Sequence, residues 1–76
     1  MNWRDYVIED PAILAGKPLI KGNRLSVEFI LELIAAGWAH EQILQNYPRL
    51  QREHILAAAA FAKDRLAEER IFATVS

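Results

Sequence analysis

The side chains best suited to chemistry in this sequence are cations, and the first group of them lies near the N-terminus. Lys17, Lys21 and Arg24 occupy residues 12–26, a segment without a single acidic residue. Because lysine and arginine neutralise phosphate charge, this pattern predicts an arm that contacts a nucleic-acid backbone. The alternative is a solvated loop in which Arg24 pairs with a carboxylate such as Glu28.

A second polar group consists of Arg49, Gln51, Arg52 and His54, at a predicted turn and in the first turn of the helix after it. In a helix-turn-helix, the start of the second helix reads base edges in the major groove. Arginine pairs with guanine and glutamine with adenine through two hydrogen bonds each. The alternative is an ordinary polar surface turn, in which Glu53 would repel phosphate.

No residues are spaced as a catalytic or metal-binding set. The chain has no cysteine, and neither His40 nor His54 has an acidic or histidine companion one helical turn further on. A chain of 76 residues seldom encloses a deep pocket. We therefore expect no enzyme activity, no catalytic residues, no metal, no cofactor and no small-molecule substrate.

Local signals predict one mainly α-helical domain over residues 1–76. Short β-prone runs around Gly and Pro indicate a β arm or hairpin at about 6–24. Ser26 is suited to cap a helix, Gly37 to end it, and Pro48 to end the next helix. The expected fold is this arm followed by a three-helix bundle, with helices at about 26–36, 40–46 and 51–70 and a tail at 71–76.

Helical spacing also predicts which residues are buried. In the third helix, Ile55, Ala59, Ala62 and Leu66 fall on one face, which Leu56 and Ala60 widen. Trp38 is expected in the core, Trp3 at a partner interface, and Arg65 in a pair with Glu69 one turn away.

Composition suggests self-association in the cytoplasm. The chain is short, 53% hydrophobic and without cysteine, so its small core needs a source of stability other than a disulfide. We expect that source to be a homodimer interface. The acidic N-terminus does not resemble a signal peptide, and no apolar run is long enough to span a bilayer. A net charge of −1 argues against indiscriminate nucleic-acid binding.

Three ordered motifs resemble domain-of-unknown-function family 433. They are Gly-Lys-Pro-Leu-Ile-Lys-Gly-Asn-Arg-Leu-Ser-Val at 16–27, Leu-Ile-Ala-Ala-Gly at 33–37, and the run at 41–50. Asn23 stands where the family usually has Thr, and its side-chain amide is still a polar donor that could reach phosphate. Ser26 stands where the family usually has Pro. The resemblance implies a homeodomain-like fold, and members of the family are often proposed as antitoxins encoded beside a PIN-like ribonuclease toxin.

Two functions remain open from the sequence. The first is a dimeric DNA-binding antitoxin or autorepressor, a transcription regulator that binds operator DNA and a toxin. The second is a structural or protein-interaction module that dimerises without binding DNA. The apolar end of the chain carries Ile71, Phe72 and Val75, which either anchor a partner toxin or cover the protein's own core.

Overall fold

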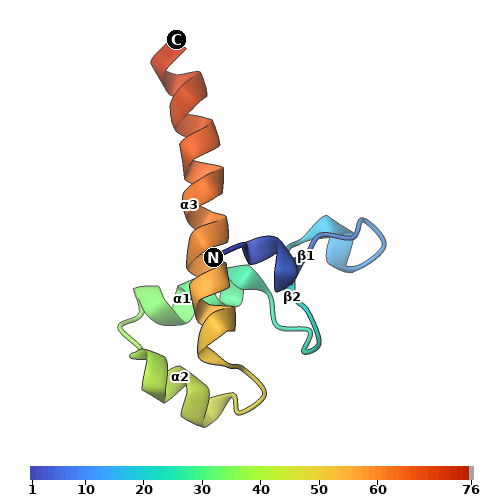
Figure 1. The fold of residues 1–76 in the computed structure, drawn as a ribbon, viewed down its shortest axis with the longest axis vertical. Helices are drawn as coiled ribbons and strands as arrows, with labels where there is room; N and C mark the ends of the chain where they lie inside the picture. Colours follow the sequence, from blue (N-terminus) through green and yellow to red (C-terminus); the bar gives the residue numbers. More distant parts are fainter. Residues whose placement is uncertain (76) are drawn as a thin grey trace.

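A short hairpin opens the fold and leads into three helices (Figure 1). The computed structural model describes the backbone of residues 1–75 and the side chains of residues 1–13 and 15–68. The elements are the 3₁₀ turns η1 (Trp3–Asp5) and η2 (Leu14–Gly16), strands β1 (Val7–Ile8) and β2 (Leu19–Ile20), and helices α1 (Val27–Ala35), α2 (His40–Asn46) and α3 (Arg52–Val75). The predicted mainly helical fold with an N-terminal hairpin is confirmed.

The hairpin is antiparallel and lies on the helices. Val7 is opposite Ile20, and Ile8 is opposite Leu19. β2 begins directly after Pro18, which has no N–H to give to a strand ladder. An isolated two-stranded hairpin is barely stable in water. Burial of Val7 and Ile20 in the core formed with the helices supplies the stability that two residues per strand cannot.

Capping residues set the bounds of the first two helices. The Ser26 hydroxyl accepts a hydrogen bond of 3.0 Å from the Phe29 N–H, so α1 begins at Val27. Gly37 follows α1 with φ of 93°, a left-handed geometry that favours glycine. α2 ends when Tyr47 leaves helical geometry ahead of Pro48.

The core lies where the first turns of α3 cross α1, α2 and the N-terminal segment. Its fully buried large side chains are Val27, Ile20, Ile30, Ile43 and Ile55. Figure 1 shows the rest of α3 projecting away from this core. The helix continues to Val75, so the segment expected as a tail is helical up to that residue. None of the described helices combines the length and the low charge that a membrane span requires.

The buried face of α3 differs from the predicted one. Ile55 is buried as expected, but the other core residues of this helix are Ala57, Ala58 and Phe61. Ala59 is exposed, and Leu56 and Leu66 are 40% and 59% exposed, so the prediction is wrong at these three positions. Ala60 and Ala62 are half-buried, and Ala60 packs against the core. Four consecutive alanines at 57–60 do not indicate which face of the helix is buried, because alanine fits both a core and a surface.

Trp3 is a core residue, and its predicted place at a partner interface is wrong. Its ring is 8% exposed and meets Phe61 edge-on, with ring centroids 4.9 Å apart. The indole Nε1–H donates a hydrogen bond of 2.7 Å to Asp64 Oδ2. Arg65 pairs with Glu9, directly after β1. The side chain of Glu69, its expected partner, lies outside the described residues. The two contacts fasten the N-terminal segment to α3, and we call them the clasp. Trp38 packs half-buried against the core, close to the prediction.

Candidate nucleic-acid interface

The loop after β2 presents two of the predicted cations. Lys21 and Arg24 are exposed, and Arg24 has φ of 53°, in the left-handed region that costs a non-glycine residue roughly 1–2 kcal/mol. Two hydrogen bonds hold this geometry. Ile20 N–H donates to Leu25 O at 2.8 Å, and Leu25 N–H donates to Asn23 Oδ1 at 3.1 Å. The loop is therefore a fixed platform for Arg24.

Asn23 holds this loop in place through its side chain. Its Oδ1 accepts the Leu25 N–H, which is a local side-chain turn typical of asparagine. Its Nδ2 is buried and has no acceptor within the described residues. Leaving such a donor unsatisfied costs about 1–3 kcal/mol. The donor expected to reach phosphate is thus covered by the protein in this structure.

The turn between α2 and α3 presents the other predicted group. Leu50 is buried and anchors the turn, and the Tyr47 ring meets the Phe29 ring edge-on at 5.5 Å. On this anchored turn, Arg49, Gln51 and Arg52 are all exposed.

His54 has a different place from its neighbours, because its side chain turns back to the start of α3. Its Nδ1 accepts a hydrogen bond of 2.9 Å from the Gln51 N–H. A bond from the N–H of the residue before the helix to the side chain of the third helical residue is one half of a capping box. The opposite side of the ring meets Tyr6 edge-on, with centroids 5.8 Å apart. His54 therefore positions the helix start instead of standing free beside Arg52.

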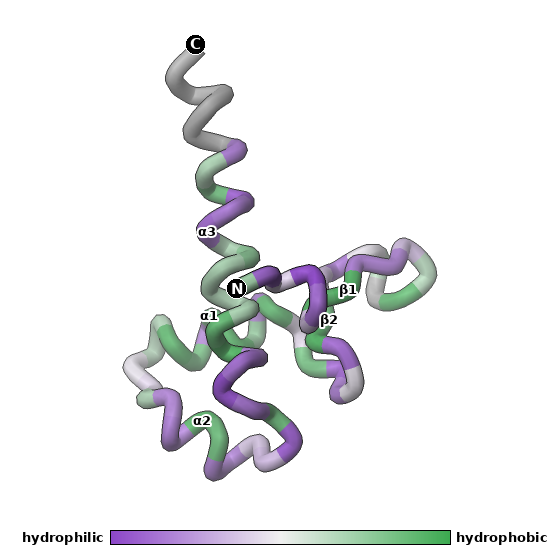
Figure 2. The backbone as a smooth tube through the Cα atoms, in the orientation of Figure 1, coloured by the Kyte–Doolittle hydropathy of each residue, from purple (hydrophilic) through white to green (hydrophobic). Residues whose placement is uncertain are grey.

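The loop and the turn lie side by side, with Arg49 of the second predicted group at the hollow between them. Asn23 and Leu25 line a hollow of about 310 Å³ together with Asn46, Tyr47 and Arg49. At the other end of the loop, the Lys21 N–H donates to the carbonyl of Tyr6, the residue whose ring meets His54. Figure 2 shows hydrophilic residues both on this loop and at the start of α3.

The cations at this junction carry no ion pairs among the described side chains. The pairs found over residues 1–13 and 15–68 are Lys63–Asp64 and Arg65–Glu9. The alternative pair between Arg24 and Glu28 does not form. We define the junction cations as Lys21, Arg24, Arg49 and Arg52. All four are exposed and are available to an external anion.

Two predicted features stand apart from the junction. Lys17 is exposed but precedes β2, whereas Lys21 follows it, so the two lysines lie at opposite ends of the strand. The side chains of Ile71, Phe72 and Val75 lie outside the described residues. Across the described part of the chain, no three His, Asp or Glu side chains gather as a metal site.

Comparison with known proteins places the chain in a family. Residues 7–62 match the family described as "Protein of unknown function (DUF433)". This range contains the hairpin, all four junction cations and the buried part of α3. The chain is also 35% identical over 60 residues to the uncharacterized protein y4eO of Sinorhizobium fredii, an alignment covering 79% of this chain. It spans only 27% of the length of that relative. No solved structure matches. Since the match covers most of the sequence, the chain belongs to the DUF433 family.

Proposed function

We propose that this chain is a cytoplasmic DNA-binding antitoxin or autorepressor that acts as a dimer and also binds a PIN-like ribonuclease toxin, without enzyme activity of its own. The observation that carries the DNA-binding part is the junction of loop and turn. Two segments about 25 residues apart in sequence, the loop at 21–25 and the turn at 47–51, share the hollow lined by Arg49. These segments and the first residue of α3 carry four exposed cations that form no ion pair among the described side chains. The resemblance to proposed antitoxins supplies the toxin partner.

The arrangement of helices suits this use. α2, the turn at 47–51 and α3 follow one another as the two helices of a helix-turn-helix do. In such a motif the start of α3 enters the major groove, so Arg52 and Gln51 would meet base edges. Lys21 and Arg24, on the adjoining loop, would meet the phosphates that flank the groove. A dimer would address two half-sites about 34–36 Å apart.

Binding measurements on two kinds of variants test the proposal. Fluorescence anisotropy would compare a duplex from the protein's own promoter with a shuffled duplex at several salt concentrations. K21A and R24A are expected to weaken binding to both duplexes and to reduce the salt slope by about one per cation. R52A and Q51A are expected to cost about 1–3 kcal/mol on the promoter duplex alone.

Lys63→Ala provides the matched control, because Lys63 is an exposed cation remote from the junction and beside Asp64. Its affinity should stay close to that of the unchanged protein. If all four variants lose the same affinity for promoter and shuffled DNA, the proposal that α3 reads bases is contradicted. Absence of binding to either duplex at low salt would remove DNA binding altogether.

A second candidate function is supported by the outer side of α3. Glu53 is exposed beside Arg52, and Leu56, one turn later, is 40% exposed. An acid and a large apolar side chain are poor contacts for a phosphate-lined groove but ordinary ones for a protein. A dimerising protein-interaction module without DNA binding would show Glu53→Ala and Leu56→Ala effects on partner binding and no binding to either duplex.

A further inference from the structure

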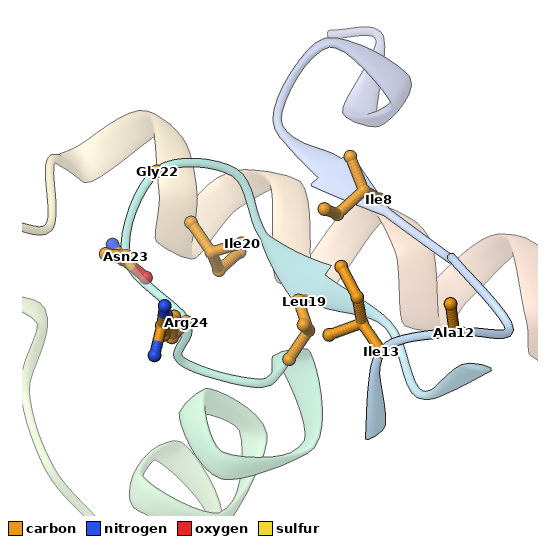
Figure 3. A pocket seen from close by; sticks show the side chains of 8 residues that line it. All are labelled: Ile8, Ala12, Ile13, Leu19, Ile20, Gly22, Asn23 and Arg24. Atoms are coloured by element: carbon orange, nitrogen blue, oxygen red, sulfur yellow. The ribbon is translucent and has the colours of Figure 1, made fainter. Parts of the chain in front are cut away.

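An apolar groove lies between the hairpin and the loop that joins its strands. It has a volume of about 680 Å³. Leu19 and Ile20, both buried, contribute from β2, and Ile8 and Ile13 contribute from β1 and the loop (Figure 3). Ile13 is 40% exposed, which leaves a large aliphatic side chain beside the groove uncovered. None of these four apolar residues takes part in the proposed DNA interface.

Charge is confined to one part of this groove. Arg24 lines it on an exposed, conformationally fixed loop and has no ion pair among the described side chains. Next to it, Asn23 also lines the groove, and its covered Nδ2–H has no acceptor. A guanidinium and an unsatisfied N–H dipole side by side make this part electropositive. No acceptor from the described residues balances it.

We propose that this groove binds a segment of a partner protein in which an aliphatic side chain stands next to an aspartate or glutamate. The aliphatic group covers the half-buried Ile8 and the exposed Ile13, and removal of this surface from water favours binding. The carboxylate accepts charge-assisted hydrogen bonds from Arg24. The groove is open, since Ile13 and Arg24 are exposed at its edge. It therefore suits a segment lying across it better than a small molecule that must be enclosed.

Two short peptides provide the probe. The full-length ¹⁵N-labelled chain would be titrated with acetyl-Gly-Leu-Glu-Gly-amide and, separately, with the matched peptide that carries Gln in place of Glu. The expected result is saturable shifts of the backbone amides of Ile13, Leu19 and Arg24 with the acidic peptide. The neutral peptide should bind about fivefold more weakly, because it lacks the charge of the carboxylate.

Three variants assign the contacts. Arg24→Ala should reduce the affinity for the acidic peptide to that for the neutral one, because only the carboxylate contact is lost. Ile13→Ser should weaken both peptides equally and leave DNA binding unchanged. Lys63→Ala, which removes a cation far from the groove, should change neither peptide.

Equal affinity of the unchanged chain for both peptides would overturn the carboxylate contact, and this comparison needs no variant to fold. Shifts confined to residues outside the groove would overturn the site. Groove amides that shift with protein concentration in the absence of peptide would show that a second copy of the chain fills the groove, which also overturns the proposal.

Discussion

The hydrogen bond between Trp3 and Asp64 makes one carboxylate more acidic in the folded protein. Donation from the indole Nε1–H, together with the ammonium of Lys63, holds the pKa of Asp64 below its ordinary value of 3.8. The folded chain therefore keeps this charge at a pH where the unfolded chain has bound a proton. The contribution to stability is fully present above pH 3.8 and is lost as pH falls through the lower folded pKa.

We expect Asp64→Asn to remove this part of the acid sensitivity. Between about pH 5 and pH 2, the Tm of the unchanged chain should fall further than that of D64N. Thermal unfolding followed by circular dichroism at a series of pH values measures the difference. Glu68→Gln, an exposed acid on the same helix, should leave the acid sensitivity as it is. A D64N curve parallel to the unchanged one would contradict the role of this hydrogen bond.

His54 gives a second prediction at the level of single residues. His54→Ala removes the acceptor for the Gln51 N–H and the ring contact with Tyr6. We expect the free energy of unfolding to fall by about 1–2 kcal/mol, the usual range for a lost helix cap with some packing. Urea denaturation measures it. His40→Ala is the matched control, because that histidine is exposed and makes no described side-chain hydrogen bond. Equal stability of H54A and H40A would rule out the cap.

The bounds of α1 and α2 could be predicted from the sequence because residues next to these bounds set them. Ser26 caps through its own hydroxyl, Gly37 adopts a left-handed conformation, and Pro48 blocks the residue before it. Each of these effects acts over four residues or fewer. The end of α3 has no such signal between Arg70 and Val75, and there the prediction stopped short of the observed helix.

The buried face of α3 could not be predicted, because a distant segment decides it. Trp3 packs on Phe61 across nearly the whole length of the chain, and this contact turns Phe61 and Ala58 inward and leaves Ala59 outside. The position of the loop beside the turn also depends on contacts between distant parts of the sequence. Residue types marked both groups as candidates, whereas their proximity depends on packing between the loop at 21–25 and the turn at 47–51.

The projecting part of α3 leads to a prediction about truncation. The last buried residue of this helix in the described side chains is Phe61, and the clasp ends at Arg65. Deletion of residues 70–76 should therefore leave the Tm and DNA binding nearly unchanged. If Ile71, Phe72 and Val75 anchor a toxin, the same deletion should abolish co-purification with the product of the neighbouring gene. Unfolding on deletion would show instead that this end of the chain is structural.

For the whole molecule, uncovered apolar surface predicts self-association. The chain has no disulfide, and Leu56 and Leu66 on α3 are 40% and 59% exposed. Burial of such side chains in a two-fold interface would add the stability that a small core lacks. Multi-angle light scattering should give twice the 8.7 kDa mass of one chain. A folded monomer that persists at high micromolar concentration would contradict the dimer.

The clasp also determines when the core can be completed during translation, because its two sides are far apart in the sequence. Trp3 emerges before the rest of the fold, and its partner Asp64 follows 61 residues later. At translation rates of about 5–20 residues per second, the indole has no partner for roughly 3–12 s. In the course of that interval the hairpin and the first two helices leave the ribosome, while the Trp3 ring and the core residues that α3 will cover are exposed to solvent. Nascent chains of this protein are therefore expected to be clients of ribosome-associated chaperones until α3 has emerged.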